Sequence, residues 1–142
     1  MHKPIFPENI DLNVLNSMGK GSMVEFLSIE YIEINSYYLR AKMPVNEKTR
    51  QPFGLLHGGA SVVLAETLGS ISSNLVIDQN KIAVGLEINA NHLRSVKEGF
   101  VYGKASPIHI GRSTHVWTIE ISDEQDNLVC ISRLTVSIID KK

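Results

Sequence analysis

Residues 58–76 read GGASVVLAETLGSISSNLV, and this stretch decides the fold. At 3.6 residues per turn its apolar side chains cover nearly the whole circumference of a helix, and such a helix is buried on most sides. We therefore predict one long buried helix from Gly58 to about Val76. The apolar positions are Ala60, Val62, Val63, Leu64, Ala65, Leu68, Ile71 and Leu75.

Patterns typical of β-strands lie on both sides of this helix. Before it, two apolar runs meet at Asn35 and Ser36, a short polar helix is expected within residues 11–23, and residues 44–56 read as a loop. After it, apolar and polar residues alternate, and short turns favour an antiparallel meander of four strands. The class is therefore α+β. The predicted strands are residues 26–34, 37–43, 84–91, 100–105, 115–121 and 128–139.

Length, charge and cysteine content narrow the class of protein. The 142 residues carry a formal charge of -1 and no basic stripe, which argues against nucleic acid as a partner. The single cysteine, Cys130, gives no sign of an oxidising compartment, and no run of signal-peptide length follows the first residues. The stretch around Glu66 is too polar for a membrane span. We expect one domain over residues 1–142, with residues 1–24 as an N-terminal arm, in the cytoplasm.

Burial of the helix also predicts an oligomer. A single sheet covers one side of a helix, whereas residues 58–76 are apolar on nearly all sides. A second subunit is the most economical cover for the remaining sides. We therefore expect at least a dimer of this chain.

Glu66 is the residue of this helix that burial does not explain. An ionised carboxylate in apolar surroundings is costly unless it is paired or its pKa rises. No Lys or Arg stands at positions 62, 63, 69 or 70 to pair with it. Glu66 shares a helical stripe with Gly59, Ser70 and Ser73, and these small residues leave room for a ligand or water. Glu66 is thus a candidate catalytic group, against the alternative of an ion pair across an interface.

The start of the helix suggests a second part of the site. Gly58 and Gly59 leave unpaired backbone N–H groups there, which suit a developing oxyanion, although such a start also lets a helix approach a sheet closely. The run from His57 to Gly59 is similar to the oxyanion motif of serine esterases, but no Gly-x-Ser-x-Gly is present. Cys130 is expected in the core. Metal-ligand spacing is also absent, so we expect neither a metal nor a cofactor.

Two longer motifs carry a resemblance to a known family. Residues 51–61 read QPFGLLHGGAS and residues 65–70 read AETLGS. The chain resembles the hotdog-fold acyl-CoA thioesterases of the phenylacetate-degradation type from about Glu25 to Ile139. Within them it is most similar to the 1,4-dihydroxy-2-naphthoyl-CoA hydrolases of menaquinone biosynthesis and the proofreading thioesterases of the enterobactin pathway. Further matching segments are residues 43–45, 84–85, 89–94 and 107–112.

The resemblance implies a fold, an assembly and roles for five residues. The fold would be a long central helix wrapped by a curved antiparallel sheet, in homodimers or homotetramers with active sites at the subunit interface. Glu66 would act as nucleophile or general base, and the Gly58 N–H would hold the thioester oxygen. Gln51 and His57 would position the thioester or water from the facing subunit, and Ser70 would assist Glu66.

The resemblance also implies contacts with CoA along two segments and at one glycine. Arg94 and Arg112 suit the phosphates of CoA, although each could equally be a solvated strand end. Ser95 departs from the family, which usually has Pro at this position. The implied contacts are Gly85, His92, Leu93, Arg94, Ser95, His109, Ile110, Gly111, Arg112, Ser113 and Thr114.

The expected function is hydrolysis of acyl-CoA thioesters, with aromatic acyl groups preferred. One alternative is a non-catalytic hotdog protein that binds acyl-CoA, but such regulators carry a DNA-binding segment and lack the carboxylate. A second is a thioesterase for aryl groups on a carrier protein. A hotdog dehydratase is disfavoured, because its chemistry needs a His on the helix and none lies between His57 and His92.

Overall fold

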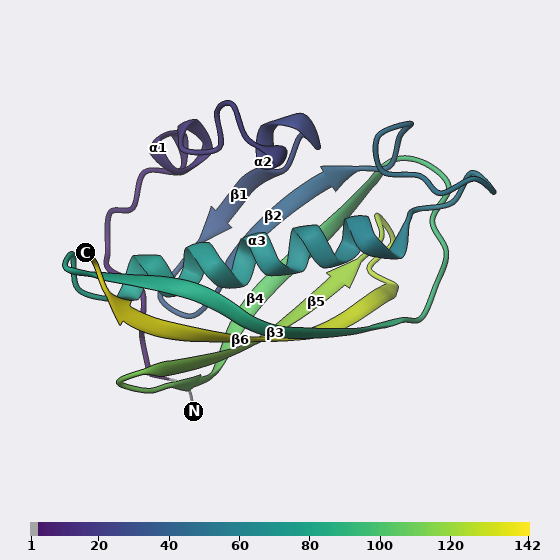
Figure 1. Cartoon of the computed structure of the whole chain (residues 1–142). Helices are drawn as coiled ribbons and strands as arrows, with labels where there is room; N and C mark the ends of the chain where they lie inside the picture. The colour runs from purple at the N-terminus through teal and green to yellow at the C-terminus, as the bar shows by residue number, and fades with distance from the viewer. Residues whose placement is uncertain (1–2) are drawn as a thin grey trace.

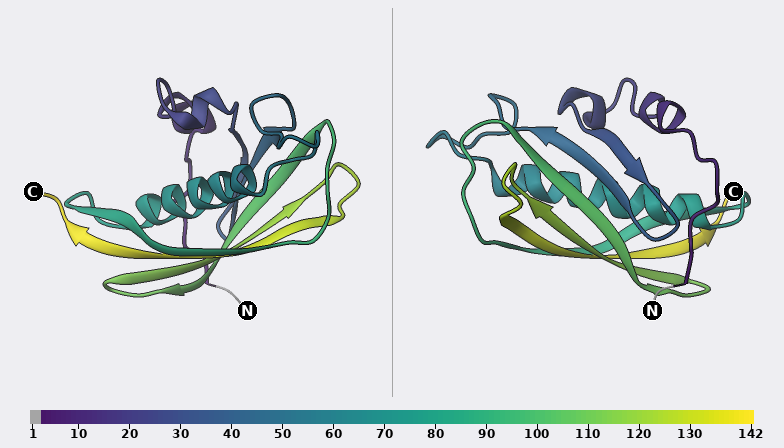
Figure 2. Two further views of the ribbon diagram at one scale, coloured as in Figure 1. Left: turned by 45° about the vertical axis from the view of Figure 1, so that its right-hand side comes forward. Right: turned by 180° about the vertical axis from the view of Figure 1, so that it is seen from behind.

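The computed structural model describes residues 3–142, which form a curved sheet around one long helix (Figure 1). The helices are α1 (Leu12–Ser17), α2 (Met23–Phe26) and α3 (Gly58–Val76). Figure 2 shows the sheet curving around α3, with α1 and α2 lying beyond the β1 end of the sheet. The strands are β1 (Glu30–Ile34), β2 (Leu39–Pro44), β3 (Lys81–His92), β4 (Phe100–Ile110), β5 (Thr114–Ser122) and β6 (Leu128–Asp140). The predicted α+β hotdog architecture is confirmed.

Helix α3 spans the predicted residues and packs its most apolar face on the sheet. Leu64, Ala65 and Leu68 are fully buried. At Gly69 a methyl group would lie 2.5 Å from Leu134 of β6, so glycine allows the helix to approach the sheet closely. The opposite face, which includes Val63, remains half-exposed in this one chain. One subunit therefore covers only part of a helix that is apolar nearly all round.

The prediction that the four strands after α3 pair in sequence order is wrong for the first pair, β3 and β4. The sheet order is β1-β2-β4-β5-β6-β3, and every pairing is antiparallel. Strand β3 pairs with β6, and β4 pairs with β2 instead of β3. Residues 93–99 join β3 to β4 and are too long for a tight hairpin. Consequently β3 lies at a free edge of the sheet.

The N-terminal region also differs from its prediction. The strand expected from residue 26 begins at Glu30, because Ser22 caps a short helix by accepting a hydrogen bond from the Val24 N–H. The Glu25 carboxylate accepts a second bond from the Gly21 N–H at 2.7 Å, which stabilises this helix start. Ser28 then adopts a φ of 59°, which is incompatible with a strand. The short polar helix expected within residues 11–23 is confirmed as α1.

Two further observations bear on the sequence expectations. Cys130 is fully buried and free, as expected, and burial raises the pKa of its thiol. Within residues 3–142, no helix has the length and apolarity that crossing a membrane requires.

Candidate active site

Glu66 lies near the middle of α3, in the wall of a groove between this helix and the N-terminal arm. The groove has a volume of about 520 Å³. Glu66, Thr67 and Ser70 line it from α3. The predicted neighbourhood of Glu66 and Ser70 is therefore present, beside an open space.

The Glu66 carboxylate has no partner within the described part of the chain. Its oxygens make no hydrogen bond, and the three ion pairs of residues 3–142 do not include it. The carboxylate rests against β3, where a methyl group on Gly85 would lie 2.7 Å from Oε2. The β3–β6 register shifts between Gly85 and Glu87, so the carboxylate meets the strand at a bulge. Gly85, expected near CoA, is thus a neighbour of Glu66 in the same subunit.

One member of the predicted small-residue stripe does not leave space beside Glu66. Ser73 is fully buried, and its Oγ accepts a hydrogen bond from Trp117 Nε1 at 2.6 Å. The same oxygen lies 2.9 Å from His115 Nδ1. Ser73 therefore belongs to a buried polar cluster that ties α3 to β5, and the interpretation of it as open space is wrong.

The start of α3 presents a free backbone donor. His57 caps the helix, and its Nδ1 accepts a hydrogen bond from the Gly59 N–H at 2.7 Å. This bond puts the proton of a neutral imidazole on Nε2. Among the residues that the structure describes, nothing accepts a hydrogen bond from the Gly58 N–H. Gly58 can therefore donate to an oxyanion at the positive end of the helix.

The predicted CoA residues 92–95 lie beside this donor. A methyl group on Gly58 would stand 2.8 Å from His92 Nε2, so the imidazole packs directly on the glycine. Gln51, Gly58, His92 and Arg94 line one cavity of about 390 Å³, to which Leu93 and Ser95 also contribute. Sequence positions from three separate segments are brought together here.

Gln51 is turned toward its own loop in this subunit. Its Oε1 accepts hydrogen bonds from the backbone N–H groups of Phe53 and Leu55. The same loop carries Phe53, which is 88% exposed.

The site residues fall into separate groups along one chain. Glu66 and Gly58 are eight residues apart on α3, which corresponds to about 12 Å along a helix. A carboxylate and an amide that act on one thioester must be much closer than this. A single subunit therefore does not bring Glu66 together with Gly58, Gln51 and His57.

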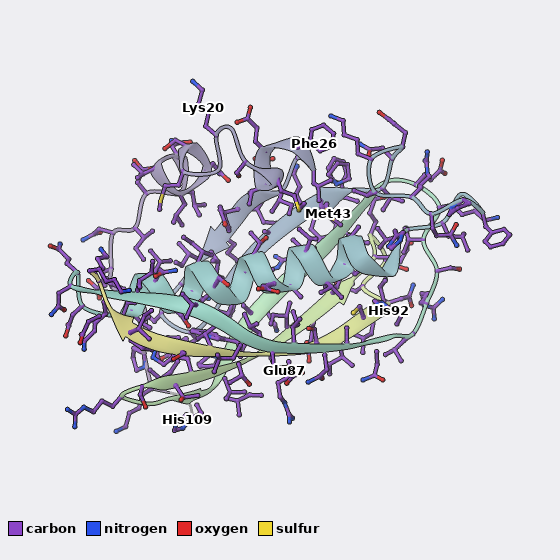
Figure 3. The ribbon with its side chains drawn as sticks, in the orientation of Figure 1. Lys20, Phe26, Met43, Glu87, His92 and His109 are labelled. Atoms are coloured by element: carbon purple, nitrogen blue, oxygen red, sulfur yellow. The ribbon has the colours of Figure 1, made fainter. Side chains whose placement is uncertain are left out.

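The second predicted CoA segment lies farther away. His109 to Thr114 span the end of β4, the β4–β5 turn and the start of β5, and Figure 3 shows His92 and His109 toward opposite ends of the sheet. Strand β4 has 11 residues, which corresponds to about 35 Å. Gly111 is enclosed there, because a methyl group on it would meet the His109 ring and the Thr114 carbonyl. Ile110 is the last residue of β4, and Arg112 and Ser113 lie in the turn itself.

Two residues near the predicted site residues were not predicted from the sequence. His115 is 2% exposed behind the β4–β5 turn, and burial lowers the pKa of its imidazole. Its place in the alternation of β5 predicted an inward side chain but no function. Tyr31, on β1, lines the groove beside Glu66. Nothing in the strand sequence EYIEI around it distinguished Tyr31 from a core residue.

An unpaired carboxylate and a free amide donor are the groups that an acyl-transfer hydrolase uses to activate water and to hold an oxyanion. Comparison with known proteins gives the same class. Residues 53–130 match the Thioesterase superfamily. The 1,4-dihydroxy-2-naphthoyl-CoA hydrolase of Escherichia coli is 53% identical over 135 residues, which cover 95% of this chain and 99% of that protein.

A second relative and a solved structure extend this comparison. The proofreading thioesterase EntH of Cronobacter turicensis is 45% identical over 135 residues, 95% of this chain and 98% of that protein. A thioesterase crystal structure from Haemophilus influenzae superimposes with a TM-score of 0.93 at 46% identity, covering 96% of this chain and 95% of its own. The chain belongs to the thioesterase superfamily and is a thioester hydrolase with the hotdog fold.

Proposed function

We propose that this thioesterase hydrolyses acyl-CoA thioesters with aromatic acyl groups, at active sites shared between subunits of a homodimer or homotetramer. One observation carries the proposal. The unpaired Glu66 carboxylate lies in an open groove, yet the free Gly58 N–H is about 12 Å away on the same helix. A second copy supplies the missing half of each site.

The free edge of β3 is the surface at which a second copy would bind. Edge strands present unpaired backbone groups, and Val84 and Leu86 on this strand are 37% and 64% exposed. Antiparallel pairing of two β3 strands would continue the sheet and bring the partner's loop with the exposed Phe53 toward Glu66. In this arrangement Gln51, His57 and Gly58 of one subunit face the carboxylate of the other.

Two chemical routes are open to Glu66. As a general base it takes a proton from water, and the resulting hydroxide attacks the thioester carbon. As a nucleophile its carboxylate attacks that carbon directly and forms an anhydride that water then cleaves. In both routes the carbonyl oxygen becomes an oxyanion that the Gly58 N–H stabilises, and CoA leaves as a thiolate that takes up a proton. Ser70, one helical turn from Glu66, would hold the attacking water.

The acyl preference rests on the groove and on a relative. The groove beside Glu66 is mostly apolar, and Leu15, Met18, Met23, Val63 and Ile71 line it. The E. coli relative at 53% identity is named for a bicyclic aromatic thioester. We propose that naphthoyl-type and benzoyl-type CoA thioesters are substrates, that the chain acts in menaquinone biosynthesis, and that it does so in the cytoplasm.

A second candidate function is hydrolysis of aryl thioesters on a carrier protein. We consider it because one relative, EntH, is named a proofreading thioesterase and not a CoA hydrolase. A panel of CoA thioesters and the matching carrier-protein thioesters, assayed for thiol release, distinguishes the two. A protein that binds acyl-CoA without releasing thiol would support the non-catalytic alternative instead.

The role of Glu66 is tested by the Glu66→Gln substitution. We expect kcat to fall by at least about a hundredfold with the fold intact, because the acid–base or nucleophilic group is lost. Glu120→Gln is a matched control, since Glu120 is exposed on β5. Unchanged turnover in folded Glu66→Gln protein would remove Glu66 from the mechanism.

A further inference from the structure

The groove beside Glu66 is closed on its far side by the N-terminal arm and bordered by Tyr31. Met18 and Met23 of the arm face Val63 and Ile71 of α3 across this space, and Tyr31 contributes from β1. The walls are therefore mostly apolar. Their polar side chains are Glu66, Thr67, Ser70 and Asn74 on α3, and Ser22 and Tyr31 on the opposite side.

The arm that forms this wall is fixed to the sheet. Asn16 makes two hydrogen bonds with the backbone of Tyr31, donating from Nδ2 to its carbonyl at 3.0 Å and accepting from its N–H at 2.8 Å. Leu15 beside it is 2% exposed. Lys48 lies over the Phe26 ring at 4.5 Å, which ties the end of α2 to the loop that carries Gln51. The groove is thus a preformed space, and Tyr31 is held in its wall by the same contacts.

The hydroxyl group of Tyr31 has no hydrogen-bond partner in residues 3–142, although the residue is only 6% exposed. In that range Ser72 Oγ is the one fully enclosed side-chain oxygen or nitrogen that lacks a partner. The Tyr31 hydroxyl is therefore not fully enclosed, and the groove is the opening that Tyr31 borders. The hydroxyl is therefore available to hydrogen-bond a molecule that fills the groove.

We propose that the groove holds the acyl group of the thioester and that the Tyr31 hydroxyl hydrogen-bonds a polar substituent on that group, so that Tyr31 selects hydroxylated acyl groups. The proposal rests on the proposed function, because it takes Glu66 as the group that acts on the thioester. It adds a specificity-determining residue that lies on β1, outside the helix and loops that carry the chemistry.

The chemistry of Tyr31 fits a neutral hydrogen-bonding group. Burial raises the pKa of Tyr31 to about 12, so its hydroxyl keeps its proton and can both donate and accept. A site that hydrogen-bonds a substrate hydroxyl rejects the analogue without it, because the buried group is then left unpaired. The methionine and aliphatic side chains around it would hold the apolar remainder of the acyl group.

The test compares wild-type protein with Tyr31→Phe on benzoyl-CoA and on the 2-, 3- and 4-hydroxybenzoyl-CoA isomers. For the best hydroxylated isomer, we expect kcat/KM to fall by about tenfold in Tyr31→Phe, the scale of one hydrogen bond, while benzoyl-CoA changes by less than about twofold. The melting temperature should stay the same or rise, because no hydrogen bond of the folded protein is lost. Tyr37→Phe is the matched control, since Tyr37 is 46% exposed on the β1–β2 turn.

Different failures have different signatures. An equal loss on benzoyl-CoA and its hydroxylated isomers, or a lower melting temperature, would show that the hydroxyl has a structural role and would overturn the proposal. No change on any isomer would overturn it as well. If wild-type protein hydrolyses none of the four thioesters, the proposed function fails, and calorimetric binding of the same thioesters then decides the role of Tyr31. Equal dissociation constants for wild type and Tyr31→Phe would count against it.

Discussion

Gly85→Ala should damage catalysis without damaging the fold. The added methyl group would stand 2.7 Å from Glu66 Oε2, whereas ordinary contacts of such a carbon begin at 3.4 Å. The carboxylate must therefore move by roughly 0.7 Å, and a misplacement of about 1 Å at a reacting group costs on the order of a hundredfold in rate. We expect kcat to fall between about ten- and a hundredfold.

The stability of Gly85→Ala should not fall together with its activity. The displaced atom is the end of a flexible side chain, and Gly85 is not among the glycines with positive φ, so alanine suits its backbone. The melting temperature should stay the same or rise slightly, because glycine weakens a strand. Gly103→Ala is the opposite control. Its methyl group would meet Leu68 Cδ1 at 2.6 Å in the core, which should cost about 1–3 kcal/mol of stability and leave turnover per folded molecule unchanged.

The assay is thiol release from an aromatic acyl-CoA, measured for both single variants and for Glu66→Gln with Gly85→Ala. If Gly85→Ala acts through the carboxylate, the double variant should be no slower than Glu66→Gln alone. A double variant whose losses multiply would refute this reasoning, as would Gly85→Ala protein with normal kcat.

Three further predictions concern assembly, substrate and pH. Glu66→Gln and Gln51→Ala subunits, unfolded and refolded together, should regain activity that neither has alone; an active monomer in sedimentation would contradict the shared site. The ratio of kcat/KM should favour an aromatic over a palmitoyl thioester, and a reversed ratio would make the aromatic assignment wrong. Burial lowers the pKa of His115 below its ordinary value of 6.5, so the unfolded chain binds more protons and the free energy of unfolding should fall as pH drops through 6.5. Urea titrations of wild type and His115→Gln at several pH values check this. The free energy of unfolding should depend less steeply on pH in the variant.

Helix α3 could be predicted from the sequence because its signal is local. The apolar positions at helical spacing and the glycines at its start fall within residues 58–76, and the observed bounds agree. The same locality limits what strand patterns reveal. Alternation in β3 and β4 indicates which side chains face the core, but the neighbour of each strand depends on the path of the chain between them. The error in the meander arose there.

Tyr31 illustrates why a site is harder to predict than a fold. From the sequence it is one aromatic residue in the strand EYIEI, where its pattern indicates an inward-facing side chain and no function. Its proposed function depends on a space that forms when the arm, β1 and α3 meet, and on the absence of a partner for one oxygen within the described residues. Neither property has a signature at the position itself. Glu66 differed, because an unpaired charge among apolar residues conflicts with its own surroundings in the sequence.

The two candidate CoA segments lead to a statement about assembly. Residues 92–95 border the cavity that contains Gly58, whereas His109 to Thr114 lie at the other end of β4, about 35 Å along the strand. Both segments can contact one CoA molecule only if they come from different subunits. A pair of subunits that joins Gly58 of one to Glu66 of the other already uses the first segment. Either a subunit other than the one that supplies residues 92–95 brings its β4–β5 turn to the CoA, or the CoA does not touch this turn, and Arg112→Ala, which would raise KM only in the first case, separates the two.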